Sequence, residues 1–242
     1  KAPSADEKLK AEAMTLDEIH QTRDKFIEAA RRAERAGFQG AELHGAHGYL
    51  ICSFLSPELN RRDDAYGGDP ERRARFLFEL VSGIRAATKP GFSLGVRLSP
   101  ERWGIQTLEI RDVAQRLMND AKTDYIGMSL WDVRKEPNDE ALQGRTLASY
   151  FTDLDRSGTR IGAAGKIMSA RDARDTLDAG FDFAILGRAA ILHHDFPKRA
   201  AADPNFAAIA TPVSEQYLRD EGLGPVFVNY MRNWKGFVAE GA

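Results

Sequence analysis

Short β-branched runs alternate with single amphipathic helices, and this alternation constrains the fold of the chain more than any other feature. Strands are expected at residues 39–44, 93–98, 124–130, 160–164 and 183–186. Helices are expected at 16–36, from 70 onward, 108–121 and 170–179. Because right-handed crossovers place each strand beside the previous one, strands joined by single helices pair in parallel. The sequence therefore predicts an α/β fold, either a closed barrel or an open parallel sheet.

Polar and glycine residues at the ends of these strands favour the barrel. His44, Arg97, Gly165 and the pair Gly187-Arg188 all come where an expected strand ends. In a (β/α)8 TIM barrel those ends form the catalytic face. We therefore predict a (β/α)8 TIM barrel.

The number of strands is too small for a complete barrel. A barrel needs eight strands, whereas five are expected here, and the chain begins at Lys1 rather than Met. We expect the chain to hold about strands 4–8 of a longer barrel protein. Residues 1–205 would form the C-terminal part of that barrel, and residues 206–242 a helical extension packed on it. Open parallel edges would have to be covered, by another chain or by a missing N-terminal segment.

The densest chemical signal is the stretch that contains His44, His47 and Tyr49. Two imidazoles three residues apart can donate hydrogen bonds to one oxygen atom, and a nearby phenol can deliver a proton. Gly45, Ala46 and Gly48 would let a flat ligand approach. Zinc ligation is an alternative, although no third ligand is evident nearby. Two structurally satisfied histidines and a packing tyrosine are a further alternative.

Three other positions suggest a bound anion. Arg97 lies within an apolar strand, where it would contact either an electron-rich ligand or a neighbouring carboxylate such as Glu42. Glycine-containing turns at Gly165 and Gly187 follow successive strands, and Arg188 comes next. In barrels such turns form a phosphate site from backbone N–H groups, to which an arginine adds a bidentate contact. The alternative is that these glycines serve backbone geometry alone.

Composition excludes several classes of protein. Lys and Arg number 34 against 36 Asp and Glu, so no nucleic-acid surface is expected, and acidic neighbours offset the arginines of residues 61–75. No apolar run is long enough to span a membrane. The single cysteine, Cys52, excludes internal disulfides and iron–sulfur clusters, and we expect it to be a packing thiol in a cytoplasmic protein. His193 and His194 are interpreted as surface or cap residues, and Trp131 as either a pocket or a core residue.

The order of several motifs resembles the old yellow enzyme family of flavin oxidoreductases. The similar segments are AGFQGAELHGAHGYL at 36–50, FLSP at 54–57, NRRDD at 60–64, YGG at 66–68 and RARF at 73–76. The resemblance runs from about residue 15 to about residue 200. It implies an FMN-containing (β/α)8 barrel that takes hydride from NAD(P)H.

The resemblance also implies an activity and a role for each candidate residue. The reaction would be reduction of activated C=C bonds in α,β-unsaturated carbonyl or nitro compounds. His44 and His47 would bind the substrate oxygen, and Tyr49 would protonate the α-carbon while flavin N5 delivers hydride to the β-carbon. Arg97 would lie beside the flavin pyrimidine. The FMN phosphate would contact the glycine turns and Arg188, at the positions Gly165, Gly187 and Arg188.

The sequence departs from the family pattern in two ways. No cysteine cluster follows the barrel, which excludes the iron–sulfur branch of the family. The first three strands of the family are absent, which leaves a second hypothesis open. The chain would then be either an ene-reductase completed by further polypeptide, including a homo-oligomer, or a non-catalytic fragment that needs a partner. A zinc hydrolase is a third class. Flavin content distinguishes the first two, and bound metal would indicate the third.

Overall fold

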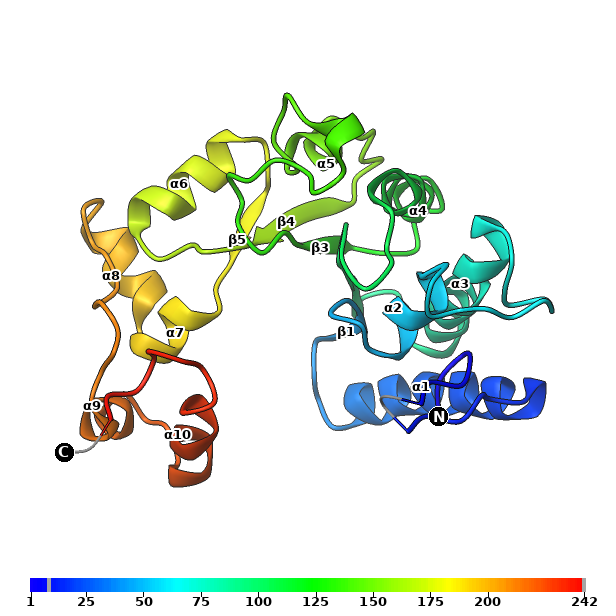
Figure 1. The fold of residues 1–242 in the computed structure, drawn as a ribbon, viewed down its shortest axis with the longest axis horizontal. Helices are drawn as coiled ribbons and strands as arrows, with labels where there is room; N and C mark the ends of the chain where they lie inside the picture. The colour runs from blue at the N-terminus through cyan, green and yellow to red at the C-terminus, as the bar shows by residue number, and fades with distance from the viewer. Residues whose placement is uncertain (8–9, 241–242) are drawn as a thin grey trace.

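The computed structural model describes residues 1–7 and 10–240, and in it the chain forms an arch (Figure 1). Its sheet consists of β1 (Gly40–Gly45), β2 (Ser93–Leu98), β3 (Tyr125–Ser129), β4 (Arg160–Ala164) and β5 (Phe183–Ile185). The first helices are α1 (Leu16–Arg35), α2 (Leu50–Leu55), α3 (Pro70–Ala87), α4 (Thr107–Asn119) and α5 (Ser149–Thr152). The remaining helices are α6 (Ala170–Asp178), α7 (Arg188–Leu192), α8 (Phe196–Ala202), α9 (Glu215–Asp220) and α10 (Pro225–Met231). A 3₁₀ turn, η1 (Glu140–Leu142), precedes α5.

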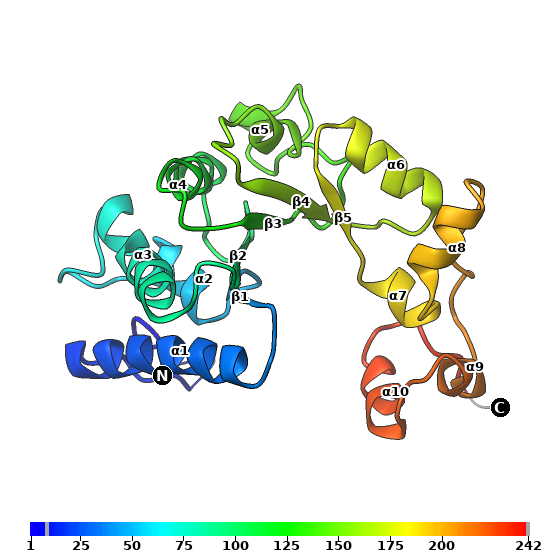
Figure 2. The same ribbon diagram turned by 180° about the vertical axis from the view of Figure 1, so that it is seen from behind.

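All five strands are parallel and lie in the sheet in chain order. Figures 1 and 2 show α3, α4, α5 and α6 on the outer side of the arch, with the strands along its inner side. In the described residues, β1 and β5 each pair with one neighbour only. The predicted (β/α)8-type arrangement is confirmed for five strands, and both edges of the sheet are open.

Local signals in the sequence account for the helix boundaries. The Thr15 side chain accepts from the Glu18 backbone, and the Glu18 side chain accepts from the Thr15 backbone, which together form a capping box at the start of α1. Asp69 caps α3 with Pro70 at its first position. Ser169 caps α6. The expected strands and these helices agree with the structure to within one or two residues.

A helix that the sequence did not indicate follows β1. The segment after Tyr49 forms α2, and five of its six residues, Ile51–Leu55, are buried. No side chain caps this helix. The Phe54 ring stacks on that of Phe76 of α3 at a centroid distance of 4.6 Å, so packing rather than local sequence stabilises the segment.

The main core lies between the sheet and its outer helices. Leu94, Val96 and Leu98 of β2 are buried there. On the inner face, a side chain at Gly95 would overlap the Tyr125 ring, and one at Gly162 would overlap the Phe183 ring. Glycine on one strand therefore makes room for an aromatic ring from the next. This inner face carries the polar side chains of Glu42 and Arg97 as well as aromatic rings.

The C-terminal segment packs against the last βα units through a second core. Leu192 of α7 is buried there with residues of α9, α10 and the tail, namely Val213, Leu218, Val228, Met231, Phe237 and Val238. The Ala208 backbone N–H donates to the Met168 carbonyl at 2.8 Å, joining this segment to the end of β4. Among the described helices, none is long and apolar enough to cross a bilayer.

Candidate functional site

A cavity of about 520 Å³ lies at the C-terminal ends of β2 to β5. The sequence-predicted residues that line it are His47, Arg97, Gly165, Gly187 and Arg188. Arg97 lies near the end of β2, and the others follow β1, β4 and β5. The C-terminal ends of four of the five strands thus contribute, as on the catalytic face of a (β/α) barrel. Four separate sequence signals thus converge on one cavity.

His44, His47 and Tyr49 lie together beside this cavity. His44 is near the end of β1, and its ring centroid lies 5.0 Å from that of His47 and 5.4 Å from that of Tyr49. The pair is formed by a strand end and a turn rather than by one helical turn, because His47 has a left-handed φ of 61°. The His47 backbone N–H donates to Ser99 Oγ at 3.0 Å, which fixes the turn against the loop after β2. Tyr49 is 65% exposed.

Both imidazoles are neutral at pH 7. Burial lowers the pKa of His44, and the nearby Arg97 charge lowers it further. Burial, Arg97 and His44 together lower the pKa of His47 to about 4. A neutral imidazole keeps one N–H to donate. The pair therefore offers two uncharged donors to an acceptor in the cavity.

Arg97 lies on the inner face of the sheet between His44 and the β3 strand. Its Nε donates to Ser129 Oγ at 2.8 Å, and in the described part of the chain it forms no ion pair with Glu42. The Glu42 carboxylate instead lies near Tyr125, where burial and that negative charge raise the pKa of the Tyr125 phenol to about 12. The remaining N–H groups of Arg97 are available to a ligand, so the ligand alternative is favoured over the carboxylate one.

The three phosphate-site candidates line the cavity where β4 and β5 end. A side chain at Gly165 would overlap the backbone of Asp132 and Val133, so only glycine fits beside that loop. A Cβ at Gly187 would meet nothing within 4 Å, which leaves open space at the start of α7. Arg188 is exposed, and its guanidinium has no ion-pair partner within residues 1–7 and 10–240. An open backbone turn beside an unpaired guanidinium fits a phosphate group, and Arg97 fits the electron-rich edge of a ring.

Backbone strain is concentrated around the same cavity. Besides His47, four of its lining residues that are not glycine have positive φ angles: Arg102 (70°), Trp103 (50°), Trp131 (66°) and Lys166 (49°). Such conformations cost about 1–3 kcal/mol each, and they occur where the surrounding structure holds them for a purpose. Their clustering is an independent indication that this cavity is the functional site.

Three tryptophans from separate segments complete the walls. Trp103 follows β2, Trp131 follows β3 and Trp234 comes from the C-terminal tail. Trp131 is 61% exposed, so of its two interpretations, a pocket residue or a core residue, the structure favours the pocket residue. The Trp103 ring lies edge-on to His47 at 5.9 Å and so helps to position it. The sequence held no signal for Trp103 or Trp234, because nothing local indicates that a tail residue returns to this loop.

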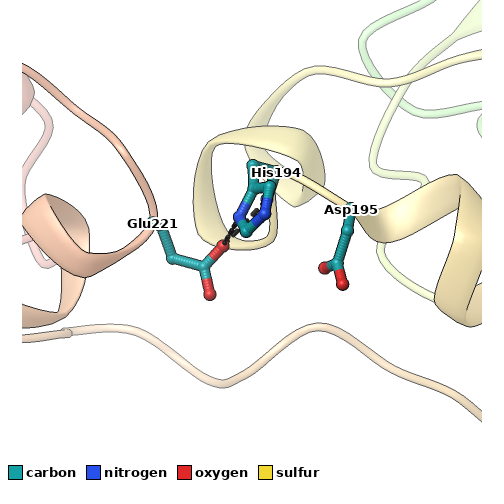
Figure 3. A group of neighbouring side chains, drawn as sticks. All are labelled: His194, Asp195 and Glu221. Carbon is teal, nitrogen blue, oxygen red and sulfur yellow. Dashed lines mark hydrogen bonds and ion pairs between the residues drawn. The ribbon is translucent and has the colours of Figure 1, made fainter.

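A separate polar cluster joins α7 and α8 to α9 (Figure 3). His194 Nδ1 lies 2.7 Å from Glu221 Oε2, and Asp195 accepts from Arg199 Nε at 2.7 Å. His193, interpreted as a surface or cap residue, is the C-cap of α7. It is buried, because residues 206–217 fold over it and its Nε2 accepts from the Ile209 backbone N–H at 3.0 Å. Among the described residues, His194, Asp195 and Glu221 form the one group of three potential metal-ligating side chains, and neither His44 nor His47 belongs to it.

Cys52 is buried in α2, as expected of a packing thiol. Burial raises the pKa of the thiol to about 11. The thiolate is therefore scarce at neutral pH, and nucleophilic chemistry at this residue is disfavoured.

The fold and cavity define an α/β protein of the barrel type, in which neutral imidazoles, a phenol and guanidinium groups gather at the C-terminal ends of the strands. The family model described as the NADH:flavin oxidoreductase / NADH oxidase family matches residues 1–205. The chain belongs to this family of oxidoreductases, whose cofactors are FMN and NADH or NADPH.

Individual relatives agree with this assignment. The chain is 36% identical over 185 residues to a probable NADH-dependent flavin oxidoreductase, YqiG, of Bacillus subtilis. This alignment covers 74% of this chain and 50% of that protein. It is 36% identical over 204 residues to an NADPH dehydrogenase of Bacillus pumilus, covering 78% and 56% respectively. A solved structure of morphinone reductase in complex with tetrahydroNAD matches with a TM-score of 0.65 and 26% identity, covering 86% of this chain and 54% of that one. The chain thus spans about half the length of these relatives.

Proposed function

We propose that this protein is an FMN-dependent ene-reductase, which uses NAD(P)H to reduce activated C=C bonds of α,β-unsaturated carbonyl or nitro compounds. The observation that carries the proposal is the grouping of His44, His47 and Tyr49 beside a cavity that also holds Arg97 and Arg188. Membership of the NADH:flavin oxidoreductase family supports the cofactor assignment.

The residues divide into a cofactor group and a substrate group. Bound FMN would accept hydride from NAD(P)H and supply it to the β-carbon of the substrate. Arg97 would hold the pyrimidine edge of the ring, where its positive charge favours added electron density. The open turn at Gly187, the backbone at Gly165 and the Arg188 guanidinium would hold the phosphate.

The substrate group acts on the carbonyl or nitro oxygen and on the α-carbon. His44 and His47 would each donate an N–H to that oxygen and draw electron density from the double bond. Tyr49 would then give its phenolic proton to the α-carbon. One hydride at the β-carbon and one proton at the α-carbon together balance the reduction of a C=C bond to a C–C bond.

The oxygen-binding role predicts the effect of removing one imidazole. His44→Ala is expected to weaken binding of a phenol ligand by about 2 kcal/mol, roughly a 30-fold rise in Kd, which is the scale of a hydrogen bond to a polarised group. Calorimetry on the flavin-loaded protein measures this value. His20→Ala on α1, outside the cavity, is the matched control. An unchanged Kd in His44→Ala would contradict the role.

The open sheet indicates how the barrel would be completed. The unpaired edges of β1 and β5 and the exposed inner face would receive about three further βα units, from an N-terminal part of the protein or from another copy of the chain in a homo-oligomer. Residues 1–205 would be the barrel part and 206–242 the extension packed on it. The single buried cysteine is consistent with a cytoplasmic setting.

A non-catalytic fragment is the second candidate, and the observation that favours it is the pair of open edges. Such a fragment would keep His44, His47 and Tyr49 without binding FMN. Flavin content of the purified protein therefore separates the two candidates.

A further inference from the structure

A third guanidinium group, that of Arg102, lies on the rim of the cavity in the loop between β2 and α4. The Arg102 guanidinium lies over the Trp131 ring, with its central carbon 4.1 Å from the ring centroid. In the part of the chain that the structure describes, this guanidinium has no ion pair and donates no hydrogen bond. A guanidinium that rests on a ring keeps the N–H groups at its edges available for an anion.

The loop holds Arg102 in place. The Ile105 backbone N–H donates to the Arg102 carbonyl at 2.8 Å. The adjacent Glu101 is buried, accepting from Lys135 Nζ and from the Asn138 backbone at 2.8 Å. Arg102 and Trp131 both have left-handed φ angles, 70° and 66°. Neighbouring contacts thus maintain two strained residues in contact with each other, which is typical of a binding site.

The charges around Arg102 leave its positive charge uncompensated. Glu101 is paired with Lys135. Asp132 lies 3.1 Å from Lys166 Nζ and 3.5 Å from Arg134 Nε. The acids on this side of the cavity are therefore neutralised. Since Arg188 is assigned to the FMN phosphate, Arg102 is the guanidinium that remains for a second ligand.

We propose that Arg102 and Trp131 form an oxyanion subsite, which binds a carboxylate or phosphate group of the ligand that enters the cavity beside FMN. This inference deepens the proposed function and rests on it. The ligand class is a planar molecule that carries an anionic group, and the anion comes either from the acceptor substrate or from the nicotinamide coenzyme.

Two pairs of probes distinguish these sources. The acceptor pair is 4-hydroxybenzoate and 4-hydroxybenzamide, which differ in the carboxylate. The coenzyme pair is tetrahydronicotinamide mononucleotide and tetrahydronicotinamide riboside, which differ in the phosphate. Dissociation constants are measured by calorimetry for the unaltered protein and for Arg102→Met, Arg102→Lys and Trp131→Leu. Arg174→Met is the matched control, since Arg174 is exposed on α6 and forms no ion pair with any residue that the structure describes.

The unaltered protein is expected to bind the anionic member of at least one pair about 10-fold to 100-fold more tightly, the range for hydrogen bonds to a charged group. Arg102→Met should abolish this preference for the anionic member and change the Kd of the neutral member by less than about twofold. Arg102→Lys should restore part of the preference. The control variant Arg174→Met should keep the full preference. Trp131→Leu should reduce it, because the guanidinium loses its support. The pair that responds identifies the source of the anion.

The subsite proposal is overturned if the unaltered protein shows no preference for the anionic member of either pair, or if that preference persists in Arg102→Met. Loss of the preference in Arg188→Met but not in Arg102→Met would likewise overturn it. The same titrations are run with and without added FMN, and flavin absorbance is recorded in each sample. Absence of flavin would count against the proposed function, whereas a surviving preference in the Arg102→Met variant would count against the subsite alone.

Discussion

Replacing Tyr49 by phenylalanine isolates the proton that the proposed reaction requires. The Tyr49 ring contacts His44 and is 65% exposed, and in the described residues its hydroxyl has no hydrogen-bond partner. Tyr49→Phe keeps the ring and removes only the hydroxyl. The free energy of unfolding should therefore change by less than about 0.5 kcal/mol. Any larger effect on catalysis then reports the lost proton.

The two half-reactions should respond very differently. A positioned general acid contributes about 10²-fold to 10⁴-fold, so reduction of 2-cyclohexenone should slow by at least about 100-fold, or roughly 2.7 kcal/mol in barrier height. Reduction of the flavin by NAD(P)H needs no proton from Tyr49 and should change by less than about threefold. Anaerobic stopped-flow absorbance at the flavin band follows each half-reaction separately.

Tyr230→Phe is the matched control for this experiment. Tyr230 is also exposed and also packs on a ring, that of Phe227 at 5.7 Å, but it lies on α10 and does not line the cavity. It should leave both half-reactions unchanged. Equal slowing of both half-reactions in Tyr49→Phe, or no slowing of alkene reduction, would refute the proton-donor role.

Two further predictions concern the turn that carries His47. The His47 imidazole should titrate near pH 4 in an NMR pH series. Because this pKa lies below the value of about 6.5 in an unfolded chain, the contribution of neutral His47 to the free energy of unfolding should be complete above about pH 6.5 and be lost as the pH falls toward 4. A midpoint near pH 6.5 would contradict the argument that burial lowers the pKa. Gly48→Ala should destabilise the fold by about 1–3 kcal/mol in urea unfolding, because Gly48 has a φ of +76° and a Cβ there would lie 2.7 Å from Trp103 Cδ1. Gly91→Ala, whose Cβ would meet nothing within 4 Å, is its control, and equal stability of the two variants would count against the strain argument.

Elements with local signals could be predicted from the sequence. The capping box of Thr15 and Glu18, Pro70 after Asp69 and the Ser169 cap each satisfy backbone groups within a few residues, so the starts of α1, α3 and α6 were recognisable. By contrast, α2 has no capping side chain and is buried almost completely. Its helical state depends on α3, which lies further along the chain, and single-sequence patterns do not contain that contact.

The residues of the candidate site were likewise predictable only where the local sequence carries a signal. His44, His47 and Arg97 could be identified because polar groups at the ends of apolar strands are conspicuous. The contact of Arg102 with Trp131 could not, since the two residues lie in different loops and have left-handed backbones that no local pattern requires. His193 caps α7, which is one of its two interpretations, but its burial could not be predicted, because the segment that covers it follows more than ten residues later.

The visible absorption spectrum of the purified protein, recorded together with its intact mass, tests the central claim most directly. We expect flavin absorbance and the release of about one FMN per protein chain on heat denaturation. We expect the Arg188→Met variant to fold but to lose this FMN. A folded protein that is colourless and takes up no FMN on titration would contradict the assignment of Arg97, Gly165, Gly187 and Arg188 to a flavin site.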